Sequence, residues 1–286
     1  MQVQLLANVS MLIAVFYHSN GGIMKIIAVI PAHLASVRLS EKMLLPIHGL
    51  PMLEHVRRRA LLSSSVSEVY VATCDDEIAK MVSSYGGNVI MTANTHKNGT
   101  SRVAEAVKSL DCSHVILLQG DEPLLDPSYI DRIAANIMAM PDRLAWNITG
   151  PIEHENELDR HSFVKCSVTR NNRIVYCFRR SPSHQDLDQQ RKYIRKILGV
   201  IAYKKDFLEE FVSFVPGEIE SGEFIEQMRI IEHGYEVYSV NVERSLPSIN
   251  EPHEISAVME YLQNDHEQMR LLQKVILNER RELTEL

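Results

Sequence analysis

The chain has 286 residues, of which 45% are hydrophobic and 23% charged, with a formal net charge of −7. These are ordinary values for a globular protein, and the length suits one large or two small domains around a buried sheet. The negative net charge argues against a general nucleic-acid binder. The cysteines are widely spaced and form no C-x-x-C pair, which disfavours a zinc site or a disulfide framework and indicates reduced thiols in the cytoplasm.

The first residues differ from the rest of the chain. The stretch 1–14 is apolar, but no Lys or Arg precedes it and it is too short to span a membrane. A strand-like run begins directly after Met24. We therefore expect residues 1–23 to be a non-native extension upstream of a natural start at Met24, and we expect no membrane partner.

The run 25–30 (Lys-Ile-Ile-Ala-Val-Ile) predicts a first buried parallel strand. The loop that follows, 31–42, carries small residues and two cations: Ala32, Ala35, Ser36, Arg38 and Lys42. Backbone amides beside small residues, together with two cations, can bind a polyphosphate. The loop has neither a Walker motif nor the glycine pattern of dinucleotide-binding folds. A solvated surface loop is the alternative interpretation of its cations.

The next segments alternate between helix and strand signals. Apolar periodicity, caps at Asp75 and Asp126, and Gly86-Gly87 as a helix stop place the boundaries. Helices are expected at 51–62, 75–85, 100–110 and 127–140, and strands at 68–72, 88–91 and 113–118. This rhythm predicts an α/β fold with a mostly parallel sheet and right-handed crossovers.

The strand at 113–118 runs into Gln-Gly-Asp-Glu-Pro at 119–123. Ligands of open α/β sheets bind beyond the carboxyl ends of the strands, and Gly120 would let a phosphate approach the backbone. Asp121 would leave the sheet edge as a hard oxygen ligand, suited to Mg²⁺ carrying a nucleotide phosphate. An ordinary turn is the alternative for these five residues taken alone.

From 145 onwards the alternation is less regular. A hairpin is expected around Asn171-Asn172, a mobile polar loop at 181–192, and a charged helical tail at 254–286. We expect the apolar stripe of the tail to pack within the chain; a dimer contact is the alternative. Further strands are expected at 199–203 and 237–242, and further helices at 207–214 and 223–233.

In order and spacing, these motifs resemble the cytidylyltransferases that activate 3-deoxy-manno-octulosonate, a sugar acid of lipopolysaccharide. The matches span about 24–262 and comprise 31–42, 49–52, 71–73, 99–105, 119–123, 164–165, 198–199 and 226–229. The resemblance implies a Rossmann-like nucleotidyltransferase fold with a mostly parallel mixed sheet and a small β-rich lobe for sugar binding and dimerisation. It also implies a cytidylyltransferase domain over 24–262, a charged C-terminal helix over 263–286, and a homodimer.

The resemblance implies attack of the sugar's anomeric hydroxyl on the α-phosphorus of CTP, with release of pyrophosphate. This displacement needs charge neutralisation and alignment more than covalent help from the protein. By resemblance, Arg38 and Lys42 would hold the phosphates and Asp121 the Mg²⁺. The implied substrate-binding residues are Ala32, His33, Ser36, Asn98, Gly99, Thr100, Arg102, Gln119, Arg179, Glu226, Gln227 and Arg229. A surface ion pair between Glu226 and Arg229 is the alternative for those two.

Four residues depart from the family pattern: His33 replaces an Arg, Phe178 a Ser, Ile197 a His and Asn250 an Asp. That Asp would be the second metal ligand, and an amide oxygen can coordinate Mg²⁺ but adds no charge, so metal affinity should fall. Another acidic sugar, of the neuraminate or pseudaminate type, is therefore an alternative acceptor. A catalytically weak nucleotide-binding paralogue is another alternative. A glycosyltransferase is disfavoured, because no Asp-x-Asp follows a buried strand.

Overall fold

The structure is a computed structural model that describes residues 16–17, 23–35, 39 and 41–278. Two residues expected at the phosphate loop, Ser36 and Arg38, lie outside the described residues, as do most of 1–23 and all of 279–286. Within the described part of the chain, no helix is both long and apolar enough to cross a membrane.

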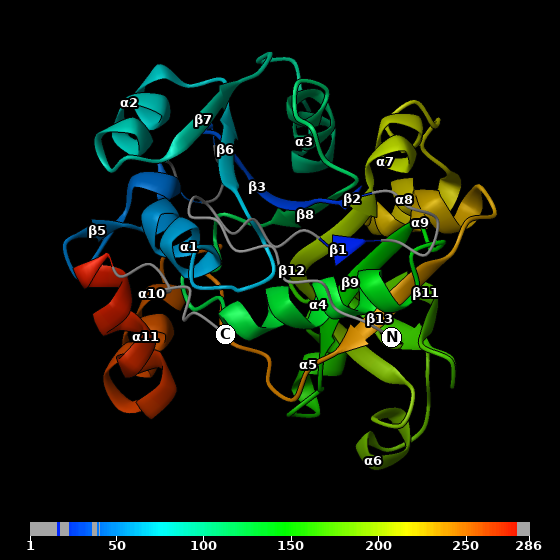
Figure 1. The fold of residues 1–286 in the computed structure, drawn as a ribbon. Helices are drawn as coiled ribbons and strands as arrows, with labels where there is room; N and C mark the ends of the chain where they lie inside the picture. The colour runs from blue at the N-terminus through cyan, green and yellow to red at the C-terminus, as the bar shows by residue number, and fades with distance from the viewer. Residues whose placement is uncertain (1–15, 18–22, 36–38, 40, 279–286) are drawn as a thin grey trace, which may run out of the picture.

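A single nine-stranded sheet forms the centre of the molecule, with the strand order β10-β11-β13-β9-β12-β8-β3-β6-β7 (Figure 1). Strands β11 and β12 run opposite to the others, so the expected α/β fold with a mostly parallel mixed sheet is confirmed. The strands are β3 (Ile26–Ala32), β6 (Val69–Thr73), β7 (Asn88–Met91), β8 (His114–Leu118), β9 (Ala145–Gly150), β10 (Lys165–Val168), β11 (Arg173–Phe178), β12 (Ile194–Lys204) and β13 (Val237–Asn241).

Helices cover both faces of this sheet. They are α1 (Met52–Ala60), α2 (Asp76–Ser84), α3 (Gly99–Val107), α4 (Pro127–Ala139), α5 (Asn156–Asp159), α6 (Leu187–Gln190), α7 (Lys205–Phe211), α8 (Glu218–Glu223), α9 (Gln227–Glu232), α10 (Glu254–Asn264) and α11 (His266–Leu277). The short elements are β1 (Phe16–Tyr17), β2 (Ile23–Met24), a 3₁₀ turn at Lys42–Leu44, β4 (Pro46–Ile47) and β5 (Leu50–Pro51).

Strand β3 shows how the two cores are built. Successive side chains of a strand point to opposite faces, so Ala28 and Ile30 pack in one apolar cluster while Ile27 and Val29 pack in the other. The first cluster includes residues of α1, α4 and α10, and the second includes residues of α3, α7 and α9. All four side chains are essentially inaccessible to solvent, which explains why this stretch reads as a continuous apolar run.

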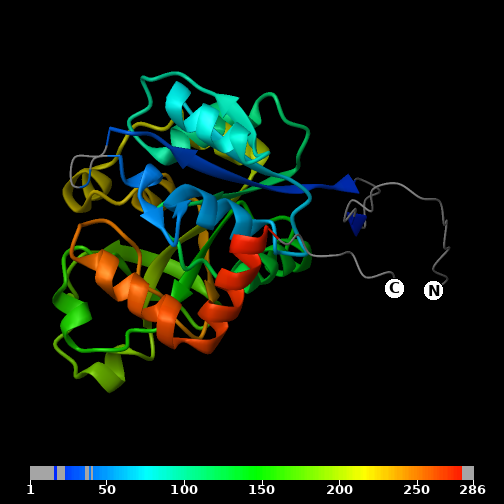
Figure 2. The same ribbon diagram turned by 90° about the vertical axis from the view of Figure 1, so that its left-hand side faces the viewer.

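The C-terminal tail is two helices rather than one continuous helix. The break falls at Asp265, whose carboxylate caps α11 by accepting the N–H of Gln268 at 3.0 Å. Because the break resets the helical phase, Leu271 and Val275 are buried, whereas the apolar side chains of Met269 and Ile276 are exposed. Helix α11 packs against α1 and against α10, so these two helices pack within the chain (Figure 2).

Two further expectations need correction. The helix expected at 223–233 begins only at Gln227, as α9, because Phe224 adopts a left-handed conformation with φ of 55° and ends the preceding helix α8 at Glu223. The polar stretch 181–192, expected to be an irregular loop, contains the short helix α6. The hairpin around Asn171-Asn172 is confirmed as β10–β11, and β10 also pairs with β12, so the hairpin belongs to the central sheet.

Candidate functional site

A cavity of about 240 Å³ opens at the carboxyl ends of β3 and β8. The two strands are parallel neighbours, with Ile26 opposite His114 and Val29 opposite Leu117, so the loops that follow them emerge side by side. This is the edge where open α/β sheets bind ligands. The lining residues are Pro31, His33, Lys42, Met43, His96, Lys97, Asn98, Gly99, Thr100, Arg102, Leu117, Gln119, Gly120, Asp121, Ile201 and Glu226.

Lys42 and Asp121 meet at one end of this cavity. The Lys42 ammonium donates to Asp121 Oδ2 at 2.6 Å, and the two side chains are only 11% and 12% exposed. The two residues follow different strands and come together only because β3 and β8 are neighbours in the sheet. An ammonium and a carboxylate at the edge of a cavity can bind a phosphate and a cation respectively.

Asn250 lies beside the backbone of the Asp121 loop. The N–H of the preceding residue, Ile249, donates to the carbonyl oxygen of Asp121 at 2.9 Å. The side-chain amide of Asn250 donates to Ser248 Oγ at 3.1 Å, and its backbone N–H donates to Glu254 at 2.7 Å. Asn250 is not among the residues that line the cavity.

The donor set of the cavity bears on the expected Mg²⁺. Across the described residues, no group of three or more His, Cys, Asp or Glu side chains could hold a metal ion alone. Mg²⁺ commonly takes one or two protein carboxylates and completes its octahedron with substrate phosphates and water. Asp121 fits that mode of binding, in which protein and nucleotide share the ion, whereas an all-protein metal cage does not fit.

The amino terminus of α3 forms the opposite wall. Asn98 caps the helix by accepting the N–H of Ser101 at 2.9 Å, which leaves the amides of Gly99 and Thr100 at the cavity. A Cβ added to Gly99 would lie 2.9 Å from Pro31 Cγ, so only glycine allows this close approach of α3 to the end of β3.

Arg102 and His33 flank this wall. Arg102 is buried, and its guanidinium donates to Thr92 Oγ1 at 2.6 Å, which ties α3 to the segment after β7. His33 lies exposed at the cavity, where partial desolvation and the charge of Arg102 lower its pKa. The neutral imidazole is therefore favoured at neutral pH.

Glu226, the residue just before α9, lines the cavity with its side chain. Its carboxylate accepts from Thr100 Oγ1 at 2.9 Å, and burial raises its pKa. Its charged form is less favourable here than in water, so Glu226 is suited to bind a hydroxyl or ammonium group of a ligand.

Four of the described residues expected to bind substrate do not line the cavity: Ala32, which is buried in β3, and Arg179, Gln227 and Arg229. Gln227 is buried and donates to Asn147 Oδ1 at 2.8 Å. Arg229 donates from Nε to Glu220 at 2.6 Å, so its ion pair is with Glu220. Arg179 donates to the carbonyl oxygens of residues 223, 161 and 224. Arg179 and Arg229 thus bind α8 and the turn that follows it, and Gln227 binds α9 to β9.

The sequence reasoning missed several lining residues. His96 contacts Ser101 Oγ through Nδ1 at 3.1 Å and Glu105 through Nε2, and Lys97 follows it. Both residues could have been identified from the sequence, because they are polar and directly precede the cap residue of a helix, and loops at this edge of a sheet face ligands. Leu117 and Ile201 form an apolar wall, and no signal separates them from ordinary core residues of β8 and β12.

Glu122, next to Asp121, lies outside this cavity. Its carboxyl group accepts the N–H of Gly199 at 2.7 Å. Burial, together with the neighbouring charge of Asp121, raises the pKa of Glu122 to about 7. Adjacent carboxyl groups therefore have different environments, one in the cavity and the other behind it.

Sequence comparisons agree with one another. A family model described as cytidylyltransferase matches residues 27–244. A 3-deoxy-manno-octulosonate cytidylyltransferase from Geotalea daltonii is 34% identical over 252 residues, which cover 84% of this chain and 99% of the relative. An 8-amino-3,8-dideoxy-manno-octulosonate cytidylyltransferase from Shewanella baltica is 37% identical over 218 residues, which cover 75% of this chain and 89% of the relative.

Solved structures are similar as well. A CMP:2-keto-3-deoxy-manno-octonic acid synthetase in complex with CTP matches with a TM-score of 0.79 and 31% identity, covering 84% of this chain and 99% of that one. A cytidylyltransferase from Leptospira borgpetersenii matches with a TM-score of 0.59 and 15% identity, covering 92% and 100% of the two chains. The second similarity is one of fold alone.

Proposed function

We propose that this chain, which belongs to the cytidylyltransferase family, transfers CMP from CTP to the anomeric hydroxyl of 3-deoxy-manno-octulosonate and releases pyrophosphate. It is a CTP-dependent nucleotidyltransferase of lipopolysaccharide precursor synthesis. The observation that carries the proposal is the meeting of Lys42 and Asp121 in one cavity with the amino terminus of α3.

Each wall of the cavity has a task in this reaction. The Lys42 ammonium neutralises the departing phosphates, and the amides at the amino terminus of α3 bind the nucleotide through their partial positive charge. Asp121 holds Mg²⁺, which when bound neutralises phosphate oxygens and keeps the triphosphate aligned. Glu226, fixed by Thr100, orients a hydroxyl of the acceptor at the far end of the cavity.

Two related sugar acids are candidate acceptors of the CMP group. One relative is named for 3-deoxy-manno-octulosonate and another for its 8-amino-8-deoxy analogue, so both are candidate acceptors. Ile201 and Leu117 make one wall apolar, and Glu226 can accept from either a hydroxyl or an ammonium group. The acidic nine-carbon sugars remain a more distant alternative.

Pyrophosphate release from CTP tests the proposal, with a panel that contains both octulosonates and neuraminate. We expect turnover that depends on Mg²⁺ and is fastest with one of the octulosonates. Fastest turnover with neuraminate would contradict the acceptor assignment. Tight binding of CTP with Mg²⁺, measured by calorimetry, but no turnover with any acid would favour a catalytically weak paralogue.

We also propose that the enzyme is a cytoplasmic homodimer. Exposed apolar side chains on the α7–α9 side, Val215, Ile219 and Phe224, support an interface on that side. Light scattering on the purified protein would give the mass directly, and a monomer at micromolar concentration would contradict the dimer.

A further inference from the structure

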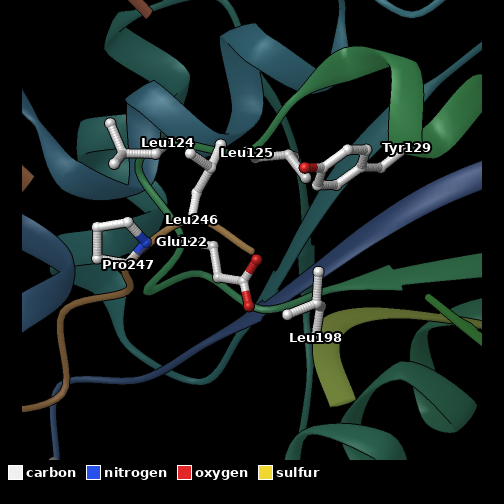
Figure 3. A pocket seen from close by; sticks show the side chains of 7 residues that line it. All are labelled: Glu122, Leu124, Leu125, Tyr129, Leu198, Leu246 and Pro247. Carbon is white, nitrogen blue, oxygen red and sulfur yellow. The ribbon is translucent and has the colours of Figure 1, made fainter. Parts of the chain in front are cut away.

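The side chain of Glu122 points into a small pocket behind the catalytic cavity (Figure 3). The pocket is lined almost wholly by apolar groups: Leu124, Leu125, Tyr129, Leu198, Leu246 and Pro247 surround the carboxyl group. A carboxyl group in such surroundings is costly unless it has a hydrogen-bonding task. None of the steps of the proposed reaction uses Glu122.

The task is visible in its contact with Gly199. Glu122 Oε1 accepts the N–H of Gly199 at 2.7 Å, and the carbonyl oxygen of Gly199 accepts the N–H of Gln119 at 2.8 Å. Both backbone polar groups of Gly199 are therefore bound by the short turn that contains Asp121. The turn is hydrogen-bonded to β12 through Gln119 and Glu122, the residues that flank Gly120 and Asp121 in the sequence.

The sheet explains why a side chain is needed here. The antiparallel ladder between β12 and β8 runs from Lys204 to Val200, where Val200 lies opposite Leu118, the last residue of β8. On its other side, the ladder between β12 and β9 shifts register between Ile197 and Ile201. The N–H of Gly199 therefore lies just beyond the end of the ladder, and the Glu122 carboxyl group supplies its acceptor.

The close approach of β12 to the 119–122 turn also explains why residue 199 is glycine. A Cβ at position 199 would lie 2.3 Å from Glu122 Oε1 and 2.9 Å from Gln119 Cβ. Contacts this short would displace the Glu122 carboxyl group from the Gly199 N–H and push Gln119 away from β12. Glu122 and Gly199 are thus matched in space as well as in hydrogen bonding.

We propose that Glu122 is a positioning residue that fixes the 119–122 turn against Gly199 and so aims the Asp121 carboxylate at Lys42 and the bound metal. The proposal rests on the proposed function for its catalytic consequence. Residues that orient a metal ligand typically change metal affinity by about 10–100-fold when they are replaced. Misplacement of a catalytic group by about 1 Å can cost about 100-fold in rate.

The first experiment measures pyrophosphate release against Mg²⁺ concentration for three variants. Glu122→Gln keeps an oxygen acceptor of the same reach, whereas Glu122→Leu has similar bulk and no acceptor. We expect Glu122→Leu to raise the half-saturating Mg²⁺ concentration about 10-fold or more, and Glu122→Gln to stay within about 3-fold of wild type. The matched control is Tyr129→Phe, which lines the same pocket but loses only its hydrogen bond to the carbonyl oxygen of Arg244. Tyr129→Phe should lower the melting temperature and leave the Mg²⁺ dependence unchanged.

The second experiment does not depend on activity. Amide hydrogen exchange should become faster in peptides covering 117–123 and 196–202 in Glu122→Leu, and stay slow in Glu122→Gln. Should Glu122→Leu fail to fold, Gly199→Ala perturbs the same contact from the other side and should give the same changes. An unchanged Mg²⁺ dependence in a folded Glu122→Leu protein would overturn the proposal, as would equal defects in the Leu and Gln variants. Absence of pyrophosphate release by the wild type would instead count against the proposed function, and hydrogen exchange would still decide the role of Glu122.

Discussion

Replacing Asp121 with Asn removes the negative charge from the cavity and changes the size of the side chain very little. Asp121 lies 2.6 Å from the Lys42 ammonium, and both side chains are about nine-tenths covered. Loss of its charge should have two separable effects. One is on the stability of the free protein, and the other is on the rate of phosphoryl transfer.

The effect on stability follows from the unpaired ammonium. Removing one partner of a buried ion pair costs about 3–5 kcal/mol, and the open cavity lets Lys42 regain some hydration, so we expect about 3 kcal/mol or less. The effect on rate is larger. A metal that neutralises transferred phosphate contributes several kcal/mol, and loss of about 3–5 kcal/mol corresponds to about a 10²–10⁴-fold fall in kcat/KM.

The assay is continuous pyrophosphate release at saturating CTP and sugar acid, beside thermal unfolding of the same samples. Asp126→Asn is the matched control: the same change in the same loop, at a residue whose carboxylate caps α4 by accepting the N–H of Ser128 at 2.9 Å. Asn is about as good an N-cap as Asp, so this change should cost less than about 1 kcal/mol of stability and leave kcat/KM within about 2-fold. An Asp121→Asn enzyme that keeps more than a tenth of wild-type kcat/KM would refute the role given to this carboxylate.

Three further changes probe the walls of the cavity and the core. Gly99→Ala places a Cβ 2.9 Å from Pro31 Cγ, and we expect the KM for CTP to rise about 10-fold with little change in kcat, measured by initial rates. The pKa of His33 is lowered, and a bound triphosphate favours its protonated form, so the KM for CTP should rise from pH 6 to pH 8. The variant His33→Arg should show a flatter dependence of KM on pH. An equal slope in both proteins would contradict this role of His33. Burial lowers the pKa of His55 from 6.5 to about 4, so the unfolded chain takes up a proton first as pH falls. Urea unfolding should therefore show a loss of about 3 kcal/mol between pH 6.5 and 4, most of it absent in His55→Gln.

The nucleotide end of the site could be predicted because its signals are local. A parallel strand buried on both faces reads as a continuous apolar run, and the loop after it is short enough to keep its residues at the sheet edge. Two such strands, β3 and β8, carry the loops of Lys42 and Asp121. The sequence alone did not show that they are neighbours in the sheet; the order of motifs shared with a known family supplied that expectation, and the parallel register of β3 and β8 accounts for it.

The other end of the site depends on a strand that the sequence did not reveal. Strand β9 is buried along its whole length yet contains Asn147 and Thr149, so it shows neither alternation nor a purely apolar run. Its polar groups have partners: Thr149 contacts Ser239 of the neighbouring strand β13 at 2.7 Å, and Asn147 accepts from Gln227 of α9. Gln227, which was expected to bind substrate, is thus hydrogen-bonded inside the protein to Asn147, whose strand was not expected.

The left-handed turn at Phe224 explains why Glu226 and Arg229 have different partners. A spacing of three residues would place the two side chains on one helical face, where they could pair. The turn ends α8, and α9 begins only at Gln227, so Glu226 precedes the helix. Glu226 accepts a hydrogen bond from Thr100 on α3, while Arg229, in the first turn of α9, donates to Glu220 of α8. The turn at Phe224 ends α8 and lets Glu220 of α8 pair with Arg229 of α9, which leaves the Glu226 carboxylate at the cavity.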